Sequence, residues 1–317
     1  FDCISAGNNH YGIIVDGKLL MGGKSNHYGQ RGYKYIPKNE LNQLNEISFN
    51  NPVIQVQCNN NSTAVLLTTG SVYFYGNWIP GPFESDASLY IKFIAIADHA
   101  YAMILSDGRI LIRYLQAKWT INNIEAKYIY LWTDNEIIHG MLGAIDKNGD
   151  LFVYHFNREN KEITRHSIKI PEPISIIKFS GRNKFTEHTY MALAESGNVY
   201  TWGANHLGQL GQGHLKSIET PTKINLSNIK SIDFCCALMC ALTKDGRVYL
   251  WGCVPGNIVP RASKIKEASS EYVTPLGDVL VPIKIMADME KISNISIGAH
   301  FAVLLTETKR IITLGQI

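Results

Sequence analysis

The sequence predicts an all-β fold: a closed, seven-bladed β-propeller with four-stranded antiparallel blades, which occupies residues 1–317 as a single domain. Three observations predict it. A hairpin phrase recurs seven times, its period is that of a propeller blade, and no window has the long 3.6-residue apolar pattern of a helix. A single hairpin cannot bury both of its faces, whereas seven twisted sheets packed around a ring can.

The repeated phrase is a β-prone run, a tight turn and a second β-prone run that closes on a glycine. The turn and closing glycines are six residues apart in the units that end at Gly23, Gly76, Gly203, Gly252 and Gly315, where Lys309 replaces the last turn glycine. Two further units, which end near Tyr114 and His155, lack the closing glycine. The turns stand at residues 17, 70, 108, 149, 197, 246 and 309, and insertions at 31–52 and 254–291 lengthen two connections. The residues expected to fix the repeat are Gly17, Gly23, Gly70, Gly76, Gly108, Gly149, Gly197, Trp202, Gly203, Gly208, Gly211, Gly246, Trp251 and Gly252.

The turns have a characteristic chemistry. Asp-Gly and Ser-Gly pairs supply the positive φ of type I′ hairpin turns, and the flanking Val, Ile, Tyr and Leu favour strands. Asp16, Asp107 and Asp245 precede turn glycines, so we expect their carboxylates to accept hydrogen bonds from the turn. His10 and His300 each follow a repeat glycine, and we expect their rings to bond a neighbouring blade; a pH-sensing or metal role is the alternative.

Composition excludes several classes of protein. Hydrophobic residues make up 45% and charged residues 18%, which excludes a mostly disordered chain. A net charge of +3 is too small to predict a nucleic-acid partner, and no apolar run has the roughly 20 residues that span a membrane. The six cysteines form no C-x-x-C pair, so we expect free thiols in a reducing compartment. A chain that begins at Phe1 is expected to be processed or trimmed, and its last unit ends soon after the hairpin.

No motif indicates an enzyme active site, a cofactor or a metal centre. The chain has neither a G-x-S-x-G elbow nor an H-E-x-x-H pattern. The glycines at 208–213 precede Pro221 and a strand-like run, whereas a nucleotide-binding loop would precede a helix. An enzyme with a site in the central channel is therefore the weakest of the alternatives.

The repeat resembles that of a known family. After Trp202 and Gly203 the chain reads ANHLGQLG, and a worn copy, KSNHYGQRG, follows Gly23. This string, preceded by a run of the A-L-x-x-x-G-x-V-Y type, is similar to the repeat of the regulator of chromosome condensation family. The resemblance spans essentially the whole chain and implies a seven-bladed propeller.

The resemblance also implies a function. Members of the family include exchange factors for small GTPases, the founding one acting on Ran, in which one face and a protruding wedge press on the GTPase. It implies a protein that stabilises the nucleotide-free form of a Ran-, Rab-, Arf- or Rho-type GTPase. We expect a monomer in the cytoplasm, with the nucleus as an alternative. One alternative function stays open: a non-catalytic interaction scaffold, either a GTPase effector-type binder or an adaptor in ubiquitin or membrane-traffic systems. A secreted bacterial effector that acts in a host cytosol also stays open as the origin of the chain.

Loops and insertions supply the candidate partner-binding residues, because a propeller normally binds through loops held by rigid blades. Residues 254–291 are the first candidate for the wedge and residues 31–52 the second. Exposed aromatic and basic side chains are the usual anchors of protein interfaces. The candidates are Arg261, Tyr272, Lys264, Lys266, Trp78, Phe83, Trp119, Tyr33 and Tyr35.

Overall fold

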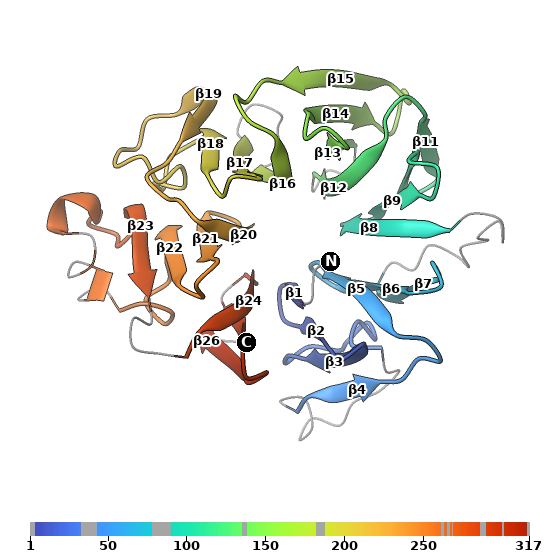
Figure 1. Cartoon of the computed structure of the whole chain (residues 1–317), viewed down its shortest axis with the longest axis horizontal. Helices are drawn as coiled ribbons and strands as arrows, with labels where there is room; N and C mark the ends of the chain where they lie inside the picture. The colour runs from blue at the N-terminus through green and yellow to red at the C-terminus, as the bar shows by residue number, and fades with distance from the viewer. Residues whose placement is uncertain are drawn as a thin grey trace. The chain divides into compact units, whose positions relative to one another are not determined.

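The structure is a computed structural model that describes residues 4–32, 43–77, 90–134, 138–181, 188–260, 263–264, 267, 269–285, 290–299 and 301–315. Within these residues, strands β1 to β26 form seven antiparallel sheets that follow one another along the chain (Figure 1). The chain divides into two compact units, residues 1–168 with Ile317 and residues 169–316.

The first unit contains four sheets. The first is built from β1 (Ile4–Ala6), β2 (Tyr11–Val15), β3 (Lys18–Gly22) and β4 (Asn45–Ile47), and the second from β5 (Val53–Cys58), β6 (Ser62–Leu67) and β7 (Val72–Gly76). The third holds β8 (Ile91–Ala97), β9 (Ala100–Leu105), β10 (Ile110–Tyr114) and β11 (Ala117–Ile121). The fourth holds β12 (Ala126–Thr133), β13 (His139–Asp146), β14 (Leu151–Asn157) and β15 (Ile163–Ile168).

The second unit contains three sheets. The fifth holds β16 (Ile174–Gly181), β17 (His188–Ala194), β18 (Val199–Gly203) and β19 (Ile218–Lys223). The sixth holds β20 (Ile229–Cys235), β21 (Leu238–Thr243), β22 (Val248–Gly252) and β23 (Val279–Ile285), and the seventh holds β24 (Ile292–Ile297), β25 (Phe301–Thr306) and β26 (Ile311–Gly315). Each sheet is hereafter called a blade and numbered in chain order.

The predicted fold class, an all-β seven-bladed propeller, is confirmed. Each of the seven predicted hairpins forms the second and third strands of its own blade, in the order that the sequence gives them. Five blades have four strands, and the second and seventh have three within the described residues. The assignment of the chain to a single domain stays a prediction.

The predicted type I′ turn occurs in blade 1, where Asp16 and Gly17 both have positive φ between the paired Val15 and Lys18. The expectation is wrong for the other hairpins. There the amide of the turn residue donates to the carbonyl three residues earlier, as Gly108 does to Leu105 at 3.0 Å, and only that turn residue has positive φ. This is a type I turn followed by a left-handed residue, which three-residue hairpin loops use. Lys309 adopts the same conformation, with a φ of 66°.

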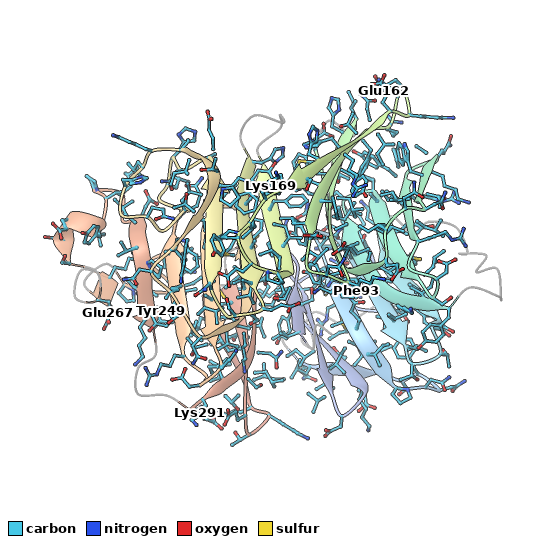
Figure 2. The ribbon with its side chains drawn as sticks, turned by 45° about the horizontal axis from the view of Figure 1, so that its top comes forward. Phe93, Glu162, Lys169, Tyr249, Glu267 and Lys291 are labelled. Carbon is cyan, nitrogen blue, oxygen red and sulfur yellow. The ribbon has the colours of Figure 1, made fainter. Side chains whose placement is uncertain are left out.

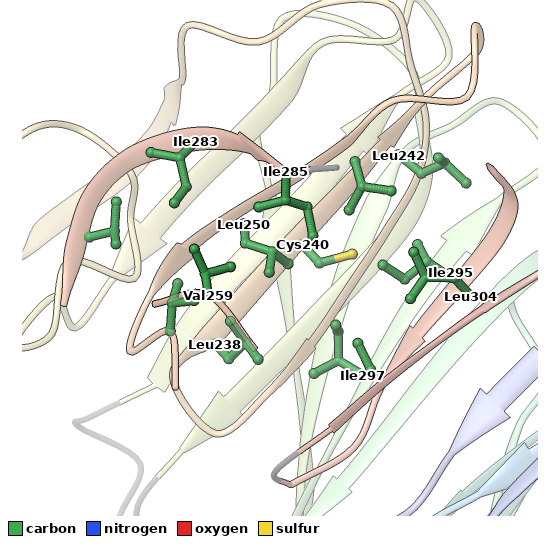
Figure 3. Close-up of a cluster of buried hydrophobic side chains, with 14 of the residues drawn as sticks. Leu238, Cys240, Leu242, Leu250, Val259, Ile283, Ile285, Ile295, Ile297 and Leu304 are labelled. Atoms are coloured by element: carbon green, nitrogen blue, oxygen red, sulfur yellow. The ribbon is translucent and has the colours of Figure 1, made fainter. Parts of the chain in front are cut away.

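The core lies between neighbouring blades. Period-two alternation turns one set of side chains from each strand toward the next sheet, where β-branched residues fill the gap. Between blades 6 and 7, Leu242, Leu250 and Ile285 face Ile295 and Leu304 in one buried cluster (Figure 3). Equivalent clusters lie between blades 1 and 2 and between blades 2 and 3.

Both predicted insertions contribute to their blades. Residues 45–47 of the first form the outer strand β4, and residues 279–285 of the second form β23. Val254, Val259 and Val273 also enter the core between blades 6 and 7. The described part of residues 254–291 is therefore a component of blade 6, and only part of it is available as a projecting wedge.

Candidate partner-binding surface

One end of blade 6 gathers several connections. Because the strands are antiparallel, the β20–β21 turn and the segment between β22 and β23 share that end, and the Cys253 amide donates to the Ala237 carbonyl at 2.9 Å. The β18–β19 loop of blade 5 joins them, since the Gly213 amide donates to the Leu280 carbonyl at 2.8 Å. Residues 204–216, 236–237 and the described part of 253–278 are hereafter the loop surface. In Figure 2, Glu267 marks this segment, and Lys291 marks the linker beyond the other end of β23.

The blade 5 part of the loop surface is fixed by two amide side chains. The Asn205 amide group donates to the carbonyls of His214 and Lys216, and its oxygen accepts the Leu210 amide at 2.9 Å. The Gln209 side chain accepts the Leu207 amide at 2.8 Å. The Gln209 carbonyl in turn accepts the indole N–H of buried Trp251 in blade 6 at 2.9 Å, so the loop is bonded to the next blade.

The repeat glycines are required by close backbone approach as well as by positive φ. A Cβ at Gly252, which has a φ of 81°, would lie 2.1 Å from the Ala237 carbonyl oxygen. A Cβ at Gly203 would lie 2.0 Å from the His188 carbonyl oxygen. A side chain at either closing position would therefore force strands apart, which explains the glycine in the repeat.

A short hairpin projects from the loop surface. Val273 pairs with Val279, and the Gly277 amide donates to the Thr274 carbonyl at 2.9 Å, which closes a turn over Pro275 and Leu276. The base is buried, because Val273 and Val279 belong to the core between blades 6 and 7. At the tip, 90% of the Leu276 side chain is exposed. This is the most exposed large apolar residue among those that the structure describes.

Lys264 links the turn of this hairpin to the start of the segment. Its side chain is buried, and Nζ donates to the Gly277 carbonyl at 2.9 Å and to the Val254 carbonyl. An ammonium group taken out of water must keep such acceptors, because leaving it unpaired costs several kcal/mol. Displacing the hairpin would break one of these bonds, so Lys264 holds the tip in place relative to the start of the segment.

The predicted partner-binding residues lie in different structural environments. Trp119 is buried in β11, with its indole N–H donating to the Lys161 carbonyl at 3.1 Å. Tyr272 is half-buried and packs against the core between blades 6 and 7. Lys264 braces the hairpin as described above. Six further candidates lie outside the described residues: Arg261, Lys266, Trp78, Phe83, Tyr33 and Tyr35. Partner contact by any of the nine residues stays a prediction.

Sequence reasoning did not select Leu276 or Leu215, whose side chain is 46% exposed on the same surface. The sequence nevertheless contains a pattern that indicates an exposed Leu276. A large apolar residue between proline and glycine, inside an expected turn, has no neighbouring strand on which to pack.

His10 bonds the neighbouring blade, as expected, through the Thr63 side chain and a backbone bond with Ser62. Its Nε2 lies 2.9 Å from Thr63 Oγ1, and that hydroxyl donates its single proton to the Gln30 carbonyl at 2.7 Å. His10 Nε2 must therefore carry the hydrogen in this pair. Burial above all lowers the pKa of His10 to about 4, and nearby Arg31 adds to the effect. His300 lies outside the described residues.

An acidic residue caps the turn of the blade 3 hairpin. Asp107 accepts the Arg109 amide at 3.0 Å, and backbone and side-chain bonds from Arg109 lower its pKa. The described residues contain no group of three or more His, Cys, Asp and Glu side chains that could hold a metal ion. No helix among them is long and apolar enough to cross a membrane.

Comparison with known proteins decides what kind of repeat this is. The family model described as the regulator of chromosome condensation (RCC1) repeat matches residues 196–242, which include the Asn205 loop. Residues 196–242 are therefore similar to an RCC1 repeat. The resemblance noted in the sequence is thereby confirmed.

Two mammalian proteins are among the relatives that this chain resembles. The mouse E3 ubiquitin-protein ligase HERC2 is 24% identical over 77% of this chain and 5% of its own length. The human regulator of chromosome condensation is 28% identical over 47% of this chain and 32% of its own length. The chain thus matches less than two thirds of either relative.

Among solved structures, Prp20p from Saccharomyces cerevisiae, reported with its binding properties to Gsp1p and histones, has a TM-score of 0.71. It is 15% identical, and the match covers 99% of this chain and 82% of that one. At this identity the likeness supports the fold. These animal and yeast relatives give no support to the alternative of a secreted bacterial effector.

Proposed function

We propose that this chain is a protein-binding propeller that acts on a small GTPase as a guanine-nucleotide exchange factor. Its similarity to the human regulator of chromosome condensation supports an exchange role, and the Gsp1p binding studied for Prp20p supports a protein partner on such a fold. The observation that supports the proposal most is the hairpin of residues 273–279, in which the pairing of Val273 with Val279 holds the exposed Leu276 at the turn.

The hairpin suits a mechanism based on differential affinity. An exchange factor accelerates nucleotide release only as far as it binds the empty GTPase more tightly than the loaded one. A tip that enters a pocket available only in the empty GTPase supplies that preference. Full burial of a leucine side chain is worth about 1.5–3 kcal/mol. The bonds of Lys264 and Asp278 hold the hairpin in advance, so little ordering cost is added on binding.

The test measures release of a fluorescent GDP analogue from Ran-, Rab-, Arf- and Rho-type GTPases, with and without the chain. We expect acceleration for one class of GTPase, and Leu276→Ala should reduce the rate about tenfold or more. Ile163→Ala is the matched control, because Ile163 is a 37% exposed apolar residue on β15 in the other unit. Acceleration that survives Leu276→Ala would remove the hairpin from the mechanism.

A point substitution is the correct variant here. Deletion of residues 254–287 would also remove β23 and the core residues Val259 and Ile283, so loss of activity would report a damaged blade. Leu276 contributes almost none of its surface to the core, so Leu276→Ala should leave thermal unfolding unchanged.

A non-catalytic scaffold is the second candidate function. It is favoured by the match to mouse HERC2, which covers most of this chain but a small part of that ligase, as expected for a propeller used as a module. A scaffold or effector would bind a loaded GTPase, or another protein, without accelerating release. Binding in one nucleotide state without acceleration would select this candidate, and no binding to any GTPase would overturn the exchange proposal.

A reducing cytosolic or nuclear compartment suits either function. The five described cysteines, Cys58, Cys235, Cys236, Cys240 and Cys253, are not joined in disulfides. This agrees with the expectation from the sequence.

A further inference from the structure

Three of the five described cysteines lie at one end of blade 6. Cys235 ends β20, Cys236 opens the turn that follows, and Cys253 follows β22, with its amide bonded to the other turn residue, Ala237. The Cys235 and Cys236 sulfurs are 3.9 Å apart. Cys236 is exposed, and Cys235 is half-buried beside the core between blades 6 and 7.

The backbone holds the two adjacent sulfurs in this arrangement. Cys235 pairs with Leu238, so Cys236 and Ala237 form a two-residue hairpin turn. Cys236 has a φ of 57°, in a region that glycine, asparagine and aspartate adopt far more readily than cysteine. The Ser180 hydroxyl donates to the Cys236 carbonyl at 3.0 Å, and the Cys253 amide to the Ala237 carbonyl at 2.9 Å. Bonds from two other segments thus tether a turn that carries a disfavoured residue.

We propose that Cys235 and Cys236 form a vicinal dithiol that a peroxide converts reversibly to a disulfide. The Cys236 thiolate attacks one oxygen of hydrogen peroxide, the S–O bond forms, and the O–O bond breaks. The leaving hydroxide takes up the proton that the thiol had lost and departs as water. The Cys235 sulfur then attacks the sulfenic sulfur, the S–S bond forms, and the S–O bond breaks with loss of a second water. With hydrogen peroxide, two thiols and one oxidant give one disulfide and two waters.

The surroundings favour Cys236 as the first sulfur to react. It is the exposed member of the pair, whereas the hydrogen bond to Cys236 and burial raise the pKa of the Cys235 thiol. Burial and Asp278 raise the pKa of Cys253, which lowers its thiolate fraction as a competitor. Cys240 is fully buried in β21, where an oxidant has no access.

The disulfide is expected to be easily reduced. Adjacent α-carbons across a trans peptide are about 3.8 Å apart, whereas disulfide-linked α-carbons are usually about 4.4–6.8 Å apart. The ring that joins neighbouring cysteines is therefore strained, and strain makes a disulfide more oxidising. Such a bond forms under oxidant and reopens in a reducing compartment, which is the behaviour of a reversible modification site.

The test treats the whole chain with hydrogen peroxide and follows its intact mass and thiol count. We expect a loss of about 2 Da and of two thiols, located by peptide fragmentation at Cys235 and Cys236 and reversed by dithiothreitol. Cys236→Gly should abolish the change and keep the turn, because glycine suits a φ of 57°. Cys253→Ser is the matched control and should leave the change intact.

Three outcomes would overturn the proposal. One is a disulfide between Cys236 and Cys253, and another is a disulfide between two chains. The third is conversion of Cys236 to sulfinic acid while Cys235 remains a free thiol. Cys240 should be alkylated only after denaturation in every sample, which verifies that the fold stayed intact during oxidation.

Discussion

The repeat loops of blades 1 and 5 have the same hydrogen bonds between side chains and backbone amides, but a different residue is buried in each loop. In blade 1, Asn26 accepts the Arg31 amide at 2.9 Å, as Asn205 accepts the Leu210 amide at 2.9 Å in blade 5. Gln30 and Gln209 likewise accept the amide two residues before them. The residue that follows this glutamine is a buried arginine, Arg31, in blade 1 and a buried leucine, Leu210, in blade 5.

The buried arginine has a second role that leucine cannot perform. Its guanidinium donates to the Gly23 carbonyl at 2.8 Å, the Gln43 carbonyl at 2.6 Å and the Asn45 side chain at 2.5 Å. It therefore ties the segment that enters β4 to the end of β3. The same loop conformation thus accommodates either a buried apolar side chain or a buried charged one, and the charged side chain also anchors a neighbouring chain segment.

Substitution of the two buried residues, Arg31 and Leu210, should cause the largest losses of stability. Arg31→Ala should lower the free energy of unfolding by about 3–5 kcal/mol, because it leaves several buried acceptors unpaired. Leu210→Ala should cost about 3 kcal/mol, through lost burial and a cavity. Urea unfolding measures both, with exposed Arg109→Ala as a control that should change little. A smaller loss for Arg31→Ala than for Leu210→Ala would contradict the anchoring role.

Acid should weaken the blade 1 loop selectively, because its bond to blade 2 passes through Thr63 and His10, whereas the blade 5 loop uses the indole of Trp251. The pKa of His10 is about 4 in the folded chain and near 6.5 when unfolded. The folded state thus binds fewer protons, so this contribution is complete above pH 6.5. About 3 kcal/mol should be lost as the pH falls from 6.5 to 4.

Urea unfolding across this pH range measures the effect. His10→Gln should reduce the slope of stability against pH between 6.5 and 4, whatever its own cost at neutral pH. An unchanged slope would mean that other groups cause the acid sensitivity.

The smallest effects should come from the bonds that tie each loop to the next blade. Trp251→Phe should cost about 1–2 kcal/mol, since it leaves the Gln209 carbonyl without its donor. Thr63→Val should cost somewhat more, since it removes both the donor to the Gln30 carbonyl and the acceptor of the His10 Nε2 hydrogen. Thermal unfolding of the two variants gives the comparison. A larger loss for Thr63→Val would show that the His10 bond adds to this link, and no loss in either variant would exclude a stabilising role for it.

Much of the fold was predictable because the inner hairpins carry strong local signals. Turn residues with positive φ and alternating β-prone runs located the second and third strands of every blade. Outer strands were harder to predict. β4 is three residues long, and β23 lies beyond a long segment, so neither follows a hairpin turn closely. Their place depends on pairing with distant residues, which a local pattern does not encode.

Trp119 shows a signal that was present and not used. Ala117, Trp119 and Ile121 alternate with polar residues, which is the pattern of a strand with one buried face, and all three are buried in β11. For the loop surface, the sequence indicated residues 254–291 as a candidate segment but not which of its side chains are exposed. Which side chain stands exposed depends on the buried contacts of Lys264, and these form only when residues 254, 264 and 277 meet in the fold.

The pairing of Gly252 with Val279 has a consequence for the history of this chain. The blade constrains where the intervening segment leaves β22 and where it returns at β23, and Val254, Val259 and Val273 of the segment pack in its core. Residues of the segment outside this core can be gained or lost over generations while the register of the outer strand is preserved. A lineage can therefore acquire a new recognition element at this position by changing loop length, with no need to alter the repeat that folds around it.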